Sequence, residues 1–354
     1  MNKKKLVLAL IGLALFLALV NVVAEQKQEP RESKRHFETI LIGKGSSPTW
    51  SPDGTKIAFI SEDGWLSVTN ANEKGIPKKI TRLKASDFDW LSNTEFIFWE
   101  QEQQRIEGVL ERPITRIKKL SLDGREELIA ENRPRKGEVP RITQPIRLPD
   151  GTVGYFENYF EQPPPYQTGD KRTFNVIKSG KLKPALIQKQ MRAYIVPNGG
   201  TGAGDIWIES MDGEIRKRIT SGRLFSFPEL SPDGSKILAT CGNLCWAMCV
   251  IDLEGNYTCI GKRGFENADS SSGSVGEKWS PDGKKIAYAY MTGKGEQLET
   301  IGSDIYIENP DGTGIIQVTN TPDEFEVNPV WSPDGTKIAC TGYYSHKIYV
   351  IKIE

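Results

Sequence analysis

Short strands that alternate apolar and polar positions recur along the chain, and each follows the same four-residue turn, Ser-Pro-Asp-Gly. Copies of this turn begin at Ser51, Ser231, Ser280 and Ser332. Proline sets φ for the second position of a type I turn, aspartate tolerates the next position, and glycine accepts the positive φ that closes a three-residue hairpin. The pattern therefore predicts β-hairpins, whose structural turn residues are Pro52, Asp53, Gly54, Pro232, Asp233, Gly234, Pro281, Asp282, Gly283, Pro333, Asp334 and Gly335.

A second hairpin follows the first in each repeat. It consists of a strand, a turn ending in glycine and another strand, as in DIWIESMDGEIRKRIT from Asp205 and DIYIENPDGTGIIQVT from Asp304. Two hairpins give four antiparallel strands, and units of about 40–50 residues with this content are typical of propeller blades. The sequence therefore predicts an all-β protein, a β-propeller of four-stranded antiparallel blades.

The number of second hairpins favours seven blades, but six remain possible because little chain precedes Met191 to form a first strand. The last blade reaches the end of the chain after its third strand, at residues 348–354. An unpaired edge strand would remain there, so we expect residues 37–43 to pair with the C-terminal strand and close the ring. The propeller domain is expected to span residues 37–354.

The repeated strings resemble those of a known group of propellers. WSPDGTKIAFI from Trp50, WSPDGKKIAYA from Trp279 and the DIYIENPDG unit from Asp304 resemble TolB-type repeats, which also occur in the propeller domains of prolyl oligopeptidase relatives. The resemblance extends over residues 37–354 and implies the fold. It implies little about function, because the matching residues are turn and core residues.

Two sets of repeated residues could be mistaken for ligand sites. The tryptophans before the turns, such as Trp50 and Trp331, are interpreted as packing between blades and not as a stacking platform. The turn aspartates are interpreted as turn residues, because calcium needs six or more oxygens and each of these aspartates stands alone between proline and glycine.

The N-terminus has the pattern of an export signal. Three lysines, Lys3 to Lys5, precede an apolar run, and small residues lead up to Ala24. Residues 1–24 are therefore predicted to be a signal peptide or an N-terminal membrane anchor, and residues 25–36 a polar leader. We expect the propeller to be extracytoplasmic, whether periplasmic, secreted or membrane-tethered on the outside, and to contact a membrane only through such an anchor.

Charge and histidine content exclude several functions. The chain has 46 basic and 46 acidic residues, and this balance argues against a nucleic-acid partner. Only His36 and His346 are present, and there is no Gly-x-Ser-x-Gly motif, so neither a serine-hydrolase triad nor a three-histidine metal site is indicated. No metal and no cofactor are expected. Carboxylate chemistry stays open, because acidic residues are abundant.

Four cysteines lie in one blade, and clustered cysteines outside the cytoplasm usually form disulfides. Three-residue hairpin loops would place Cys241 opposite Cys245 and Cys249 opposite Cys259. A thiolate metal site and free thiols are the alternatives. Cys340 is expected to be a buried free thiol.

Loops of irregular length are confined to one face, which marks the binding face of a repeat protein. The favoured function is an exported, non-enzymatic binding and scaffold module of the cell envelope, whose partner is a protein, a peptide or an envelope polymer. The alternative is an extracytoplasmic hydrolase or lyase that uses carboxylates at the central channel. The candidate binding residues are Arg105, Tyr155, Tyr159, Tyr166, Asp269, Tyr290 and His346.

Overall fold

The structure is a computed structural model in which the chain divides into two compact units, Met1–Arg35 and His36–Glu354. All described residues belong to the second unit. They are residues 37–83, 88–102, 105–106, 109–110, 114–132, 139–142, 145–147, 151–160, 172–178, 190–197, 203–211, 214–222, 224–241, 247–261, 274–293, 300–321 and 324–353. The predicted signal or anchor and the polar leader lie outside these ranges. No helix within the described residues is long and apolar enough to cross a membrane.

Every regular element of the described residues is a β-strand, and the strands form antiparallel sheets. One sheet has the strand order β26-β27-β28-β1-β2-β3-β4 and therefore contains both ends of the second unit. Its strands are β1 (Thr39–Trp50), β2 (Lys56–Ser61), β3 (Trp65–Asn70), β4 (Lys78–Arg82), β26 (Glu326–Trp331), β27 (Lys337–Gly342) and β28 (Lys347–Lys352).

The strands between these ends form the other sheets. A four-stranded sheet and a small hairpin contain β5 (Phe88–Trp90), β6 (Glu95–Glu102), β7 (Arg105–Ile106), β8 (Val109–Leu110), β9 (Ile114–Ser121) and β10 (Glu126–Asn132). The next sheet contains β11 (Val139–Ile142), β12 (Ile146–Arg147), β13 (Val153–Phe160) and β14 (Arg172–Lys178).

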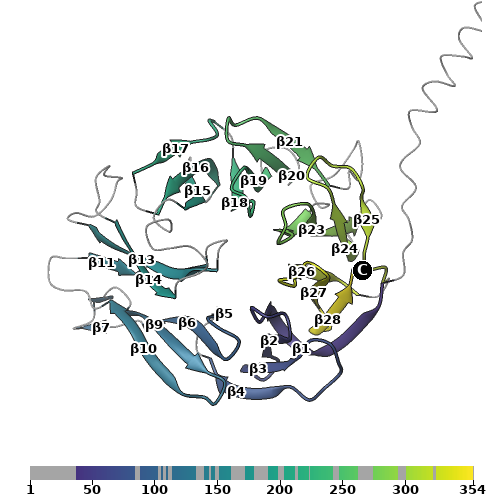
Figure 1. Cartoon of the computed structure of the whole chain (residues 1–354), viewed down its shortest axis with the longest axis horizontal. Helices are drawn as coiled ribbons and strands as arrows, with labels where there is room; N and C mark the ends of the chain where they lie inside the picture. Colours follow the sequence, from purple (N-terminus) through teal and green to yellow (C-terminus); the bar gives the residue numbers. More distant parts are fainter. Residues whose placement is uncertain are drawn as a thin grey trace, which may run out of the picture. The chain divides into compact units, whose positions relative to one another are not determined.

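Two more sheets complete the series. The first holds β15 (Met191–Pro197), β16 (Gly204–Ser210), β17 (Arg216–Arg218), β18 (Phe225–Leu230), β19 (Lys236–Cys241), β20 (Ala247–Asp252) and β21 (Tyr257–Ile260). The second holds β22 (Ser274–Trp279), β23 (Ile286–Gly293), β24 (Thr300–Glu308) and β25 (Ile316–Gln317). Within the second unit, the sheets follow one another around a common centre, which is the arrangement of a β-propeller (Figure 1).

The long strand β1 belongs to two groups of strands. Its first half pairs with β28, with Thr39 opposite Ile351, and its second half pairs with β2, with Trp50 opposite Ile57. The change of partner occurs at Gly45, where a Cβ atom would overlap the carbonyl oxygen of Ile60. Glycine is needed there because the two backbones approach too closely for any side chain.

The repeated turns are held by local hydrogen bonds. In the first copy the Ser51 hydroxyl donates to Asp53 Oδ1 (2.6 Å), the Thr55 amide donates to the same oxygen (3.0 Å), and the Lys56 amide donates to Ser51 Oγ (2.9 Å). The glycine that ends each of the four turns has φ between 69° and 75°. The hydrogen bond from Ser231 and those from Ser235 lower the pKa of Asp233 to about 2, so this aspartate is a charged turn residue.

The tryptophans before the turns connect neighbouring repeats, which confirms their interpretation as packing residues. Each is at most 8% exposed and donates its indole N–H to a backbone carbonyl of another repeat. The pairs are Trp50 to Val330 (3.0 Å), Trp90 to Thr49 (3.1 Å), Trp279 to Glu229 (3.2 Å) and Trp331 to Lys278 (3.2 Å). Each acceptor immediately precedes the tryptophan, or Leu230, of the other repeat, so the contact is itself repeated.

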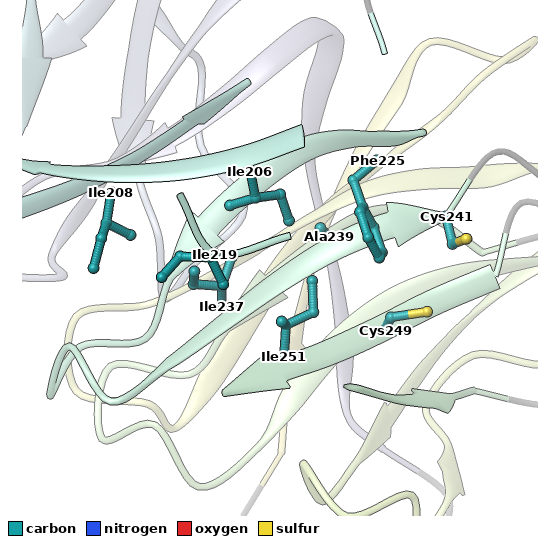
Figure 2. Packing of buried hydrophobic residues seen from close by; sticks show 9 residues of the cluster. All are labelled: Ile206, Ile208, Ile219, Phe225, Ile237, Ala239, Cys241, Cys249 and Ile251. Atoms are coloured by element: carbon teal, nitrogen blue, oxygen red, sulfur yellow. The ribbon is translucent and has the colours of Figure 1, made fainter. Parts of the chain in front are cut away.

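The hydrophobic core lies between successive sheets rather than at one centre. Ile206, Ile237 and Ile251 meet where the group β15–β17 packs against β18–β21 (Figure 2). Comparable clusters lie between other neighbouring sheets among the described residues. This packing requires strands that are apolar on both faces, and the sequence pattern predicts such strands.

Candidate binding surface

Among the described residues, a group of contacting aromatic side chains with two exposed tyrosines and a half-buried phenylalanine lies where β26 begins and β27 turns into β28. It consists of Phe325, Tyr343 and Tyr344, called the aromatic patch below. Their ring centroids lie 5.1–5.9 Å apart, and the rings of Tyr343 and Tyr344 are nearly perpendicular, at 86°. Tyr343 is 58% and Tyr344 74% exposed. Large aromatic side chains gathered in the open are typical of binding surfaces.

The backbone beneath the aromatic patch is tightly constrained. The Tyr343 amide donates to the Phe325 carbonyl (2.7 Å), which joins the turn to the start of β26. A Cβ atom at Gly342 would overlap the side-chain oxygens of Ser345 and Glu324, so a larger residue would displace these two side chains. His346 has a φ of 53°, and its carbonyl accepts a hydrogen bond from the Gly45 amide (2.6 Å). The rings therefore stand on a fixed frame.

The carboxylate of Glu324 holds this part of the backbone in place through hydrogen bonds. Glu324 accepts hydrogen bonds from Lys347 Nζ (2.6 Å), Ser345 Oγ (2.7 Å) and the Tyr349 hydroxyl (3.2 Å). Burial raises the pKa of Glu324, but the hydrogen bonds from Lys347 and Ser345 outweigh it and leave the pKa below its ordinary value. Glu324 is therefore charged at neutral pH and holds the turn against β28.

The aromatic patch lies at the opposite end of the strands from the repeated turns. The turn that starts at Ser332 leads into β27, and the aromatic patch lies beyond the other end of that strand, at Gly342. Six strand residues span about 20 Å. The patch is thus on the side of the irregular loops, where the sequence predicts binding.

Two carboxyl groups have strongly raised pKa values, but both are sealed from solvent. Burial raises the pKa of Glu326 to about 7, opposed by hydrogen bonds from Thr321 and Thr319, and Glu326 is 1% exposed. Burial likewise raises the pKa of Glu308 to about 7, and this residue is fully buried. A general acid or base must reach its substrate directly or through one water. In this conformation neither group can do so.

The neighbourhood of Glu326 contains a second acid, Asp304. Thr319 Oγ1 lies 3.4 Å from an oxygen of each carboxylate and bridges them. Asp304 also accepts hydrogen bonds from Gln317 Nε2 (2.9 Å) and the Thr321 amide (3.2 Å). Among the described residues, no group of three or more His, Cys, Asp or Glu side chains is arranged to hold a metal ion.

A strained aromatic residue lies in the innermost strand of another sheet. Phe227 in β18 has a φ of 51° and is 79% exposed. It stands four residues before a repeated turn, at a β-bulge, and the corresponding positions hold Ser47, Gly276 and Asn328, also at positive φ. A bulky residue in this region is unusual, and the strain costs about 1–2 kcal/mol. Phe227 is therefore a second candidate for contact with a ligand.

Replacing Phe227 by asparagine is expected to stabilise the fold by about 1 kcal/mol, because asparagine tolerates positive φ and little buried surface is lost. Thermal or urea unfolding measures the change. Phe227→Leu is the matched control, since leucine keeps the strain and should bring no gain. Equal stability of the asparagine and leucine variants would show that the backbone at this bulge is not strained.

The candidate binding residues predicted from the sequence differ in their exposure in the structure. His346 is exposed and borders the aromatic patch. Tyr290 is 5% exposed and packs edge to face on Tyr306 at 5.9 Å, so its assignment to a binding face is wrong. Tyr155 is half-buried against the cluster that contains Ile117.

The remaining candidates are only partly described. Arg105 lies in β7 and Tyr159 in β13, but only their backbones are described. Tyr166 and Asp269 lie outside the described residues. Sequence reasoning missed Phe325, Tyr343 and Tyr344. The available signal was the pair of adjacent tyrosines in Gly-Tyr-Tyr-Ser-His-Lys, which breaks the apolar alternation between two strands.

The cysteine register agrees with the sequence for one pair only. Cys249 lies opposite Cys259 in β20 and β21. Cys241 lies opposite Ala247, so the expected three-residue loop that would place Cys241 opposite Cys245 is wrong, whereas a disulfide between these two cysteines stays a prediction. Cys245 itself lies outside the described residues. Cys241 and Cys340 are buried thiols without a disulfide.

We expect Cys249 and Cys259 to form a disulfide when the protein is exported. The backbone hydrogen bond of Asp252 to Asn256 makes Cys249 and Cys259 a non-hydrogen-bonded pair, whose Cα atoms lie about 4.5 Å apart, within reach of a disulfide. Mass spectrometry of non-reduced peptides from exported protein tests this. Recovery of both as alkylated thiols, without prior reduction, would contradict it.

Comparison with known proteins finds distant structural similarity and no related sequence. No protein-family model matches the sequence, and no curated protein matches it either. The structure is similar to the C-terminal WD40 domain of Sif2, with 12% identity, 90% of this chain and 99% of that chain covered, and a TM-score of 0.49.

Two further solved structures are similar at the same level. The β-propeller domain of Cps50 (Swd1) from Myceliophteria thermophila has 12% identity, covers 90% of this chain and 98% of its own, and gives a TM-score of 0.48. The oligogalacturonate lyase of Vibrio parahaemolyticus has 12% identity, with 88% and 78% covered and a TM-score of 0.40. These values carry no argument about what the chain binds. The arrangement of its own sheets defines it as an all-β protein with propeller architecture.

Proposed function

We propose that this protein is an exported, non-enzymatic binding module of the cell envelope, built on a TolB-type propeller. Its loop-rich face binds a protein, a peptide or an envelope polymer. The observation that carries this proposal is the aromatic patch, whose rings contact one another in the open on a frame fixed by Glu324. A few large aromatic side chains supply most of the energy in many interfaces.

The propeller of the proposal has seven blades and is closed by β1 and β28. The seven proposed blades are β1–β4, β5–β10, β11–β14, β15–β17, β18–β21, β22–β25 and, as the last, β26–β28 together with the first half of β1. The indole hydrogen bond from Trp50 to Val330 supports closure, because it joins the first repeat to the last in the same way as Trp331 to Lys278 joins two consecutive repeats.

Export is the part of the proposal that rests on sequence alone. The basic and apolar pattern of residues 1–24 would direct the chain out of the cytoplasm, by cleavage or as an anchor. The domain from residue 37 onward would then act outside the cytoplasm, in the periplasm, at the surface or in the medium.

A second candidate function is carboxylate-dependent hydrolysis or elimination. The observation that favours it is the raised pKa of Glu326 beside Asp304, since perturbed acids cluster at active sites. The burial of Glu326 weighs against it, because a substrate would need the surrounding β24 and β26 to separate.

The proposed function is tested by crosslinked capture with the tagged full-length chain in its native cells. Tyr343→Ala with Tyr344→Ala should reduce recovery of the main partner about tenfold or more while the melting temperature stays the same. The matched control is Ile76→Ser, which changes an exposed apolar residue on the side of the repeated turns. Undiminished capture by the tyrosine variant would contradict binding at the patch. Turnover of a glycan or peptide that Glu326→Gln abolishes would favour the second candidate.

A further inference from the structure

We propose that the aromatic patch binds a proline-rich segment in the polyproline II conformation, and that its occupant is residues 161–166 of a second copy of this chain. This inference rests on the proposed function, because it names the partner of the same surface. The segment reads Glu-Gln-Pro-Pro-Pro-Tyr and belongs to the connection between β13 and β14. It lies outside the described residues.

The chemistry of the aromatic patch suits such a segment. Proline-rich peptides dock on clustered aromatic side chains, because the polyproline II helix is already formed and loses little entropy on binding. Near-perpendicular rings, 86° between Tyr343 and Tyr344 and 73° between Phe325 and Tyr344, expose ring faces and ring edges side by side. Tyrosine hydroxyls can also donate to peptide carbonyls, which a polyproline II chain leaves without internal partners.

Charge complementarity selects this segment among proline-rich sequences. Lys44 is exposed in β1 opposite Lys347 of β28, and because Lys347 is paired with Glu324, Lys44 supplies the positive charge at this border of the aromatic patch. The segment carries Glu161 two residues before its first proline. An acidic residue there can meet the basic border while Pro163 to Pro165 lie on the rings, although an exposed pair of this kind adds at most about 1 kcal/mol.

The occupant must come from another copy because the connection is too short to reach the aromatic patch of its own chain. Pro163 is the third residue after β13 ends at Phe160, so the chain that joins them spans at most about 10 Å. The sheets of β1–β4 and β5–β10 lie between the two sites on one side and those of β15–β25 on the other (Figure 1). Packed sheets are about 10 Å apart, so the route within one chain is longer than this reach.

Association of this kind is reciprocal in a dimer. Each copy has one aromatic patch and one proline segment, so two copies related by a two-fold axis would make the contact twice. The second contact then forms within the complex, which strengthens weak individual contacts through effective concentration.

The first experiment uses a fluorescent synthetic peptide of residues 159–169 titrated with the full-length protein. Tyr343→Ala with Tyr344→Ala should weaken its binding about tenfold or more, as should replacing Pro164 and Pro165 of the peptide by alanine. Ile76→Ser should bind like the unchanged protein. Binding that is insensitive to both pairs of changes would overturn the proposal.

The second experiment measures the oligomeric state of the full-length chain by sedimentation equilibrium. Dimerisation should be lost in the tyrosine variant and equally in the Pro164→Ala, Pro165→Ala variant, and mixing the two should restore a weaker heterodimer, because each supplies the partner that the other lacks. A chain that binds the peptide but stays monomeric at high concentration would overturn the assignment to a second copy.

The two proposals fail in distinguishable ways. If the tyrosine variant loses its captured cell-envelope partner but the peptide never binds, the proposed function stands and the polyproline inference fails. If the peptide binds and dimers form but capture of a separate partner is unchanged, the aromatic patch serves self-association and the proposed function of binding another molecule at this surface fails.

Discussion

Replacing Glu308 by glutamine is expected to raise the stability of the protein at pH 8 and to leave it unchanged near pH 4. Glu308 is fully buried at the end of β24, and neither carboxylate oxygen accepts a hydrogen bond of normal geometry from the described residues. Burial raises its pKa from 4.5 to about 7, and the Gly261 backbone and the Tyr288 hydroxyl, which favour the charged form, offset this only in part. Charging Glu308 within the fold is therefore unfavourable.

The sign of the effect follows from proton binding. Between pH 4.5 and pH 7 the folded protein holds a proton on Glu308 that the unfolded chain has released, so the free energy of unfolding falls as pH rises through this window. Above the folded pKa the loss is complete and amounts to about 3 kcal/mol. Glutamine cannot ionise and does not incur this loss. Glu326 has a similarly raised pKa and lowers stability in the same window.

The measurement is a series of melting temperatures between pH 4 and pH 8.5. At pH 8, Glu308→Gln should melt about 5 °C higher than the unchanged protein. Glu254→Gln changes an exposed carboxylate in a turn and is the matched control, with the pH dependence of the unchanged protein expected. If the melting temperatures of the unchanged protein and of Glu308→Gln depend on pH in the same way, Glu308 is not protonated in the folded state.

Deleting residues 37–42 is expected to abolish soluble, folded protein or to lower its melting temperature by many degrees, whereas deleting residues 25–36 should have little effect. The first deletion removes the strand that pairs with β28, including the pairs of Thr39 with Ile351 and Ile40 with Val350. It also removes Ile42, which is 2% exposed and packs in the cluster that contains Phe59 and Ile348. The edge of β28 and part of the core are then open to water.

A point variant separates the contribution of side-chain packing from that of backbone pairing by the strand. Ile42→Ala should cost about 3 kcal/mol, because it leaves a cavity in a buried cluster. Thr39→Ala changes an exposed side chain of the same strand and should cost little. Far-UV circular dichroism during thermal unfolding, with expression yield for the deletions, measures these effects. Equal tolerance of the two deletions would contradict closure through β1.

The turns and hairpins of this protein follow from sequence because their interactions are local. In each repeated turn the serine, aspartate and glycine that hold the backbone lie within five residues, as in Ser51, Asp53 and Gly54, so no distant contact is needed. The pairing of β19 with β20 shows the limit of local reasoning. There the length of the connecting loop shifted the register, and Cys241 came to lie opposite Ala247.

Exposure could not be predicted from the strand pattern. Tyr290 lies within the second strand of its unit and Tyr343 just beyond the end of the second strand of another, and Tyr290 is covered by Tyr306 and the neighbouring sheet while Tyr343 is exposed. Packing between sheets determines whether such a side chain is exposed, and the alternation of apolar and polar positions along a strand does not carry this information. Glu308 is a similar case, since a glutamate next to a turn suggests a solvated side chain and only the adjacent sheet buries it.

The sequence by itself determined the repeat, the four-stranded antiparallel units, the packing role of the tryptophans and the face on which the irregular loops lie. Tertiary structure alone decided which aromatic side chains gather at that face, because Phe325 meets Tyr343 and Tyr344 across a whole hairpin of β26 and β27. It also decided the strain at Phe227 and the raised pKa values of Glu308 and Glu326. The aromatic patch and the raised pKa values depend on how segments distant in sequence cover one another, which is set by long-range packing, whereas the strain at Phe227 arises at a bulge that recurs in the repeats.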